Sequence, residues 1–111
     1  MKKRIDLVKQ YLAAYAAKDI DPISALISSD VKLQDWNIQG SGAEFFLAET
    51  AKNFDQAQEI RIEILRLHES DSAIAAQLHI ELDGGAVALQ VVDVICFDDE
   101  NRISEVRAYK G

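Results

Sequence analysis

The sequence has 111 residues, of which 49% are hydrophobic and 28% charged, with a single Pro and a single Cys. This composition is typical of a soluble globular protein, and we expect one domain over residues 1–111. A net charge of -7 opposes binding to nucleic acid and to anionic membranes. No apolar run is long enough to span a membrane, and polar residues interrupt the segment after the basic N-terminus, so we expect a cytoplasmic protein.

Three helices are predicted in the first half of the chain. Over residues 5–18, apolar side chains recur at steps of three and four residues, with Tyr11 and Tyr15 on or near the buried stripe. Asp21-Pro22 is typical of an N-cap followed by the first residue of a helix, and this short helix is expected to end near residues 28–30.

The third helix is predicted from a capping box. Ser41 would be the N-cap and Glu44 the third helical residue, and the helix would continue to about Asp55. Its inward stripe is expected to consist of Phe46, Thr50 and Phe54.

Strands are predicted where apolar and polar residues alternate and turn residues intervene. The expected strands cover residues 31–36, 59–67, 73–82, 90–97 and 102–109, with a tight hairpin at residues 83–85. The order is helices, one strand, a helix and then an antiparallel meander. This order predicts an α+β fold in which helices cover one face of a curved sheet.

Two carboxyl groups are expected to face the interior. Asp93 shares its side of a strand with Val91 and Ile95, and both sides of that strand are largely apolar. Asp35 shares its side with Leu33, and strict alternation would place Trp36 on the opposite side unless the strand end bulges. An ionised carboxylate in an apolar interior is costly, so each is expected to be paired, hydrogen-bonded or protonated.

The other face of the Asp93 strand is also apolar. It would be too large to leave bare to water, so we expect a homodimer formed through the outer face of the sheet. The residues concerned are Ala88, Val92, Val94 and Cys96.

Several segments resemble a known superfamily. They are residues 11–14, 19–21, 31–35, 41–42, 92–93 and 106–111. With these segments the chain resembles the ketosteroid isomerase branch of the superfamily that also contains nuclear transport factor 2 and the SnoaL-type polyketide cyclases. The resemblance implies a nuclear transport factor 2-like cone, in which three N-terminal helices pack on a curved, mixed or antiparallel sheet around a pocket.

The resemblance also implies a chemistry. The catalytic tyrosine and two aspartates of ketosteroid isomerases fall on Tyr11, Asp35 and Asp93. By this resemblance Asp35 is the base that moves a proton on an apolar carbonyl compound, without a cofactor. Tyr11 and a protonated Asp93 would donate hydrogen bonds to the oxyanion, as in ketosteroid isomerases, the standard example of a carboxylic acid kept neutral for this purpose.

The pocket wall should also contain residues that contact the ligand. We expect them to be Tyr15, Trp36, Phe46, Thr50, Phe54, Val91, Ile95 and Ala108. Family isomerases often have a further Tyr where this chain has Thr50, and Pro where it has Trp36, which predicts a pocket of different size or shape.

Other functions stay open at this point. Tyr11 and Asp93 could serve packing and structure alone, and Asp35 could bond only the turn at Asn37. The protein would then be a non-catalytic binder of a small hydrophobic molecule or a dimeric accessory protein, with a pocket filled by aromatic side chains. Epoxide hydrolysis would need an Arg and a further carboxylate that we do not find. Neither histidine is near the two acids, which argues against a metal site.

Overall fold

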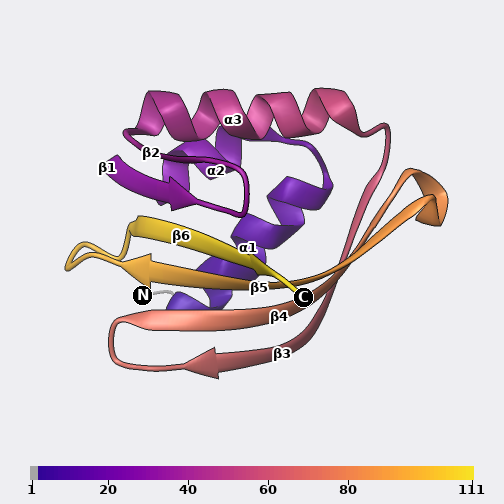
Figure 1. Ribbon diagram of the computed structural model, residues 1–111. Helices are drawn as coiled ribbons and strands as arrows, with labels where there is room; N and C mark the ends of the chain where they lie inside the picture. Colours follow the sequence, from indigo (N-terminus) through magenta and orange to yellow (C-terminus); the bar gives the residue numbers. More distant parts are fainter. Residues whose placement is uncertain (1–2) are drawn as a thin grey trace.

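The computed structural model describes residues 3–111, in which three α-helices and six strands follow one another along the chain (Figure 1). In chain order the elements are α1 (Arg4–Ala16), α2 (Ile20–Leu26), β1 (Ile27–Gln34), β2 (Gln39–Ser41), α3 (Ala43–Gln56), β3 (Ile60–Glu69), β4 (Ala73–Leu82), the 3-10 turn η1 (Asp83–Gly85), β5 (Val87–Phe97) and β6 (Ile103–Lys110). No helix in this part of the chain is long and apolar enough to cross a membrane.

The strands form one mixed sheet in the order β2-β1-β6-β5-β4-β3. Strands β3 to β6 are an antiparallel meander, and β1 pairs in parallel with β6. The sheet bends, and all three α-helices lie on one side of it (Figure 1). The predicted cone of three helices on a curved sheet is therefore confirmed, and within residues 3–111 no helix lies on the other face of the sheet.

The start of α2 differs from the prediction. Asp19, with an extended backbone, is the N-cap, and the helix begins at Ile20. Pro22 therefore stands at the third helical position, where its missing N–H removes no helical hydrogen bond. The helix also ends earlier than expected, because β1 begins at Ile27 and residues 28–30 are extended.

The predicted capping box of α3 is wrong. Ser41 belongs to β2, where it pairs with Lys32 of β1. Gly42 is the N-cap, its backbone has a φ of 99°, and no side chain caps the helix. The chain thus turns from a strand into a helix at a residue whose positive φ favours glycine.

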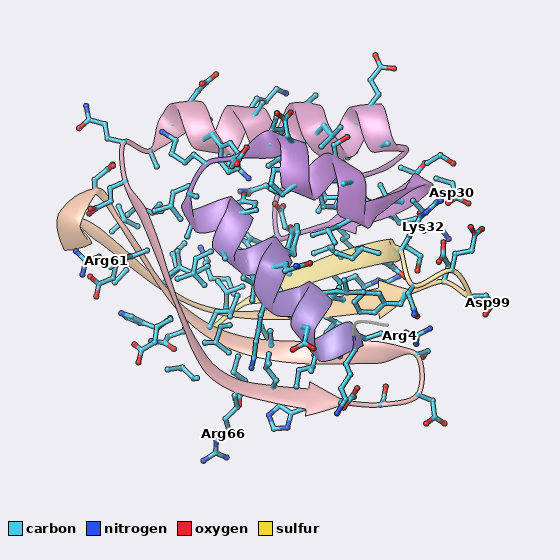
Figure 2. The ribbon with its side chains drawn as sticks, turned by 180° about the vertical axis from the view of Figure 1, so that it is seen from behind. Arg4, Asp30, Lys32, Arg61, Arg66 and Asp99 are labelled. Carbon is cyan, nitrogen blue, oxygen red and sulfur yellow. The ribbon has the colours of Figure 1, made fainter. Side chains whose placement is uncertain are left out.

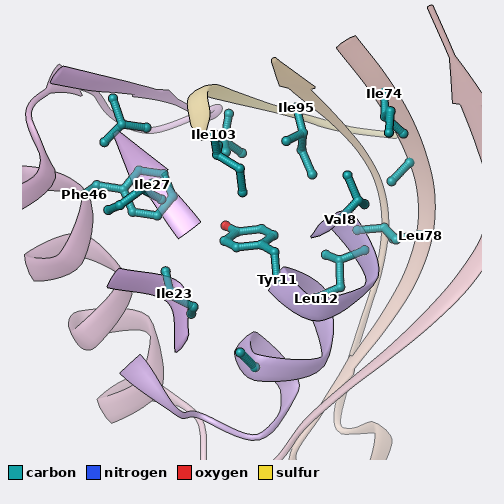
Figure 3. Close-up of a cluster of buried hydrophobic side chains, with 14 of the residues drawn as sticks. Val8, Tyr11, Leu12, Ile23, Ile27, Phe46, Ile74, Leu78, Ile95 and Ile103 are labelled. Carbon is teal, nitrogen blue, oxygen red and sulfur yellow. The ribbon is translucent and has the colours of Figure 1, made fainter. Parts of the chain in front are cut away.

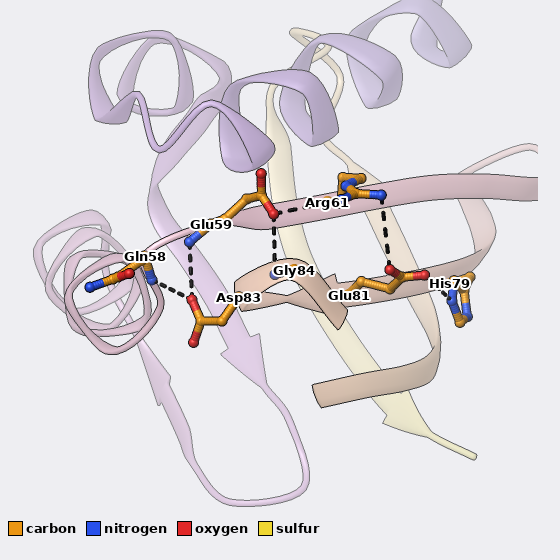
Figure 4. A network of polar contacts seen from close by, with 7 residues as sticks. All are labelled: Gln58, Glu59, Arg61, His79, Glu81, Asp83 and Gly84. Atoms are coloured by element: carbon orange, nitrogen blue, oxygen red, sulfur yellow. Dashed lines mark hydrogen bonds and ion pairs between the residues drawn. The ribbon is translucent and has the colours of Figure 1, made fainter. Parts of the chain in front are cut away.

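The hairpin between β4 and β5 follows the prediction. Strand β4 has the expected bounds, and Asp83, Gly84 and Gly85 all have positive φ angles. One carboxylate oxygen of Asp83 accepts hydrogen bonds from the backbone N–H groups of Gln58 and Glu59, at 2.7 and 3.1 Å (Figure 4). The hairpin is therefore fastened to the segment that leads into β3.

The core lies between α1, α2 and α3 and the concave face of the sheet (Figure 3). Each fully buried apolar side chain contributes about 1.5–3 kcal/mol to folding. Labelled charged side chains such as Arg61, Arg66 and Asp99 project outward from the ribbon (Figure 2). The core side chains labelled in Figure 3 are Val8, Tyr11, Leu12, Ile23, Ile27, Phe46, Ile74, Leu78, Ile95 and Ile103.

Candidate active site

A cavity of about 390 Å³ lies between the helices and the concave face of the sheet. Its size is toward the lower end of the roughly 300–1,000 Å³ common for small-molecule sites. The wall is formed by Tyr11, Leu12, Tyr15, Leu33, Asp35, Trp36, Asn37, Phe46, Thr50, Asn53, Gln56, Ala57, Ile60, Ile62, Leu78, Ile80, Leu82, Leu89, Val91, Asp93, Val106 and Ala108. It is largely apolar and contains two ionisable carboxyl groups and neither Arg nor Lys.

Asp35 is held by the backbone that follows β1. Its Oδ1 accepts hydrogen bonds from the N–H groups of Asn37 (2.7 Å) and Ile38 (2.9 Å), and its own N–H donates to the Ile38 carbonyl (3.0 Å). These bonds fix the carboxylate at the edge of the cavity and leave Oδ2 without a partner among residues 3–111. The expected bond to the turn at Asn37 is thus present, and the same side chain lines the cavity.

Asp93 lies on the concave face of β5, also in the cavity wall. Burial raises the pKa of its carboxyl from 3.8 to about 7. In the part of the chain that the structure describes, no group donates a hydrogen bond to it. At or below neutral pH, a large share of the Asp93 carboxyl is therefore protonated and can donate a hydrogen bond into the cavity.

Tyr11 reaches from α1 into the middle of the buried cluster (Figure 3) and is only 4% exposed. Burial, and then the neighbouring Asp93 and Tyr15, raise the pKa of the phenol well above its usual range. The phenol is therefore neutral at physiological pH, and its O–H has no acceptor among residues 3–111. Its ring centroid is 6.3 Å from that of Phe46, which also lines the cavity.

Tyr15 is one helical turn beyond Tyr11, with ring centroids 6.0 Å apart. Asn53 of α3 donates a hydrogen bond from Nδ2 to Tyr15 Oη at 2.8 Å. Burial raises the pKa of this phenol, the Asn53 bond lowers it, and the charges of Asp93 and Asp35 raise it. Tyr15 therefore lies close enough to both acids to respond to their charge.

Trp36 lies beyond the end of β1, so the alternation that would place it opposite Asp35 does not apply. It lines the cavity and is 43% exposed, with Lys110 Nζ 5.4 Å from its ring centroid. The aromatic residues expected to fill the pocket do not fill this cavity. Trp36 is partly exposed to solvent, and Phe54 is not part of the cavity wall.

The structure brings most of the expected ligand contacts together. Tyr15, Trp36, Phe46, Thr50, Val91 and Ala108 all line the cavity with the three expected catalytic residues. Phe54 and Ile95 do not. Phe54 packs edge-on against Tyr15, with ring centroids 5.1 Å apart, and Ile95 is fully buried in the core.

Sequence reasoning did not select the polar residues Asn37, Asn53 and Gln56. All three are exposed at the surface and also line the cavity. Only Asn53 gave a signal, since it stands beside the inward stripe of α3. No cluster of three or more His, Cys, Asp or Glu side chains in residues 3–111 has the geometry of a metal site.

Most of the chain matches one known protein family. Residues 8–106 match the model of the SnoaL-like domain. The chain belongs to this SnoaL-like family. A search of curated proteins gave no match to the sequence.

Solved structures share the SnoaL-like fold over nearly the whole chain. A candidate SnoaL-like polyketide cyclase from Shewanella putrefaciens CN-32 has a TM-score of 0.86 at 18% identity, covering 99% of this chain and 80% of that one. A candidate isomerase of the SnoaL-like family from Agrobacterium tumefaciens C58 has a TM-score of 0.84 at 16% identity, covering 100% and 99%. An LEH-like epoxide hydrolase from M. tuberculosis has a TM-score of 0.81 at 21% identity, covering 97% and 82%. At these identities the likeness establishes the fold.

Proposed function

We propose that this SnoaL-like protein is a cofactor-independent, steroid delta-isomerase-like enzyme that moves a proton within an apolar carbonyl compound. The observation that carries the proposal is the shared cavity of Asp35, Asp93 and Tyr11, whose wall is otherwise mainly apolar. A base and two neutral hydrogen-bond donors around one mainly apolar cavity are the groups that such a reaction needs.

Asp35 is the proposed base. Its Oδ1 is engaged by two backbone N–H groups, so Oδ2 is the oxygen available to a substrate. In a β,γ-unsaturated ketone, Oδ2 takes the proton from the α-carbon, and the C–H electron pair becomes the π-bond of a dienolate whose charge lies on oxygen. The protonated Asp35 then returns the proton to the γ-carbon. The double bond moves into conjugation, and no proton or electron is gained or lost overall.

Tyr11 and Asp93 are the proposed donors to the dienolate oxygen. Both are neutral when the carboxyl of Asp93 is protonated, and neither donates to another group in residues 3–111. Donors that are already oriented in a cavity of low polarity stabilise the developing oxyanion more than water does, and loss of one such donor typically costs about 10²–10³-fold in kcat.

The substrate class follows from the wall of the cavity. A volume of about 390 Å³ and walls of Leu, Ile and Val favour an apolar molecule of small or moderate size. The absence of Arg and Lys from this wall disfavours phosphorylated or carboxylated substrates. It also disfavours epoxide hydrolysis with an arginine in the site, even though one structural neighbour is an LEH-like epoxide hydrolase.

The test is turnover of two β,γ-unsaturated ketones, a ketosteroid and a smaller bicyclic ketone, followed by absorbance of the conjugated product. The variant Asp35→Asn keeps an oxygen that can accept the two backbone bonds but removes the base. We expect a loss of about 10²–10⁴-fold in kcat. Asp30→Asn is the matched control, because Asp30 is an exposed carboxylate on the same strand. Equal rates for wild type and Asp35→Asn would rule out the proposed base.

A second candidate function is binding of a small hydrophobic ligand without catalysis. The hydrogen bonds from Asn37 and Ile38 to Asp35 favour it, since they give this carboxylate a structural role that needs no substrate. In that case wild type and Asp35→Asn would bind an apolar ketone with the same affinity, and neither would convert it.

We also propose that the protein is a homodimer formed through the outer face of the sheet. Val92, Val94 and Cys96 project from β5 on the side opposite Asp93, and Tyr109, directly across from Val92, is 49% exposed. No helix of residues 3–111 covers this face (Figure 1). A second copy of the chain would remove these apolar side chains from water.

A further inference from the structure

The hydroxyl oxygen of Tyr15 accepts a hydrogen bond from one partner, and the hydroxyl proton can be donated to another. Asn53 donates from Nδ2 to Tyr15 Oη at 2.8 Å, so the phenol oxygen acts as the acceptor in this bond. The phenolic proton must then point elsewhere, and nothing in residues 3–111 accepts it. Both side chains line the cavity. Because Tyr15 lines the cavity, this proton is available to an acceptor bound there.

The ring of Tyr15 packs against two other aromatic rings. Phe54 packs against it edge-on, with ring centroids 5.1 Å apart and an interplanar angle of 76°. Tyr11, one helical turn earlier, has its ring centroid 6.0 Å from that of Tyr15. A residue four positions along a helix is displaced by about 6 Å along the axis. Tyr15 therefore offers a second donor, separated from Tyr11 by about one helical turn and nearer the exposed Asn53.

From this arrangement we propose that Tyr15, oriented by Asn53, binds a second oxygen of the ligand. The substrate is then an apolar carbonyl compound that carries a hydroxyl or a second carbonyl on the part that lies beside Tyr15, about one helical turn from the reacting carbonyl at Tyr11. This inference rests on the proposed function, because it takes the reacting carbonyl to lie at Tyr11 and Asp93. Asn53 is a positioning residue here, and Tyr15 is the residue that contacts the ligand.

The energetic reason is the cost of an unpaired donor. A ligand with no second oxygen displaces water from the Tyr15 hydroxyl and gives nothing in return, whereas a ligand with that oxygen replaces the lost bond. A site with a hydrogen-bond donor that has no acceptor in the protein therefore prefers a ligand that supplies one. The burial of Tyr15 and its response to the charges of Asp35 and Asp93 agree with a position inside the site and not outside it.

The experiment compares the binding of two probes, a decalone and the same decalone with a hydroxyl on the second ring. Binding is followed by fluorescence of Trp36, the single tryptophan, which lines the cavity, and is checked by calorimetry. We expect wild type to bind the hydroxylated probe about fivefold more tightly, the effect of one net hydrogen bond. In Tyr15→Phe the ratio should fall to about one, while affinity for the plain decalone changes less than about twofold.

Asn53→Asp tests the positioning role. A carboxylate at this site can only accept, so it takes the phenolic proton of Tyr15 away from the ligand, and the ratio should again fall to about one. Asn53→Ala should lower the ratio less, because the phenol stays free to rotate. Lys52→Ala is the matched control on α3, since Lys52 is exposed and pairs with Glu49, and it should keep the fivefold preference.

The outcomes separate this inference from the proposed function. Equal binding of the two probes by wild type, or a preference that survives Tyr15→Phe, overturns the role of Tyr15 and leaves the turnover test of Asp35 unaffected. Failure of wild type to bind either probe overturns the inference, while the proposed function is still decided by the turnover test of Asp35. The inference is supported if Tyr15→Phe and Asn53→Asp both lose the preference for the hydroxylated probe and still bind the plain decalone as wild type does. This support does not depend on whether Asp35→Asn converts substrate as fast as wild type.

Discussion

Asp93 on β5 lies directly opposite Ala108 on β6. Its neighbour on the other side, on β4, is Ala76. A methyl group cannot donate a hydrogen bond to the carboxyl, and it is too short to fill the space in front of it. Two small residues beside one acid thus explain both the cavity at this point and the lack of a partner for Asp93. The raised pKa of Asp93 comes from the burial of its carboxyl away from water.

The first prediction follows from this pairing. Ala108→Leu should project a larger side chain into the cavity beside Asp93 and lower the affinity for an apolar ketone at least tenfold. The cost of overpacking should be about 1–3 kcal/mol in the free energy of unfolding, because the cavity accepts part of the added volume. Calorimetric titration and urea unfolding measure the two effects. Ala51→Leu, at an exposed position of α3, is the control; equal loss of binding in both variants would contradict the prediction.

The second prediction concerns the pH dependence of turnover. Asp93 donates to the oxyanion only when protonated, and its pKa is about 7. The rate should therefore fall as the pH rises through about 7, approaching a tenfold decrease per pH unit at higher pH. Steady-state kinetics between pH 5 and 9 would measure it.

Asp93→Asn is the control for this pH effect, because an amide donates a hydrogen bond at every pH in that interval. The decrease in rate near pH 7 should disappear in this variant, with a lower rate overall. A decrease that persists unchanged in Asp93→Asn would assign the titration to another group.

The third prediction concerns stability. The pKa of Asp93 is higher in the folded chain than in the unfolded chain, so between pH 4 and 7 the folded state binds more protons. The contribution of this group is fully present below about pH 4 and is lost as the pH rises through about 7, by about 4 kcal/mol at most. Asp93→Asn removes this loss. Relative to wild type, the variant should gain unfolding free energy between pH 4.5 and pH 8, as measured by urea denaturation; a constant difference would show that Asp93 does not titrate near 7.

The fold could be predicted where the pattern is local. Strand β4 was predicted with its observed bounds, and the positive φ angles of Asp83, Gly84 and Gly85 match the turn chemistry of their sequence. Strand β2 was missed, because three polar residues at a sheet edge give no alternation. Helix α2 ends earlier than the sequence pattern predicts because Ile27 already pairs in parallel with Ile103 of β6, a contact between residues far apart in sequence.

The candidate site was predicted in part for the same reason. Alternation along a strand was enough to predict that Asp93 faces inward, and the family resemblance predicted that Tyr11 and Asp35 share its site. The hydrogen bond between Tyr15 and Asn53 could not be predicted, because the two residues lie on different helices and are 38 positions apart in sequence. Ile95 is expected in the cavity wall because it shares the face of Asp93. In the structure it is fully buried in the core instead.

The last prediction tests the homodimer. Val94 lies opposite Arg107 on β6 and Ala75 on β4, near the middle of the uncovered face. Val94→Arg would place a second positive charge beside Arg107 and a charged group at the centre of an apolar contact, which costs several kcal/mol when the charge is unpaired. At micromolar concentration, sedimentation should give wild type twice the mass of one chain and the variant the mass of one chain. Val87→Arg, an exposed residue near the β4–β5 hairpin, should stay dimeric. A wild type that sediments as a monomer would contradict the proposed interface, while the cavity and its chemistry lie on the opposite face of the sheet and do not depend on it.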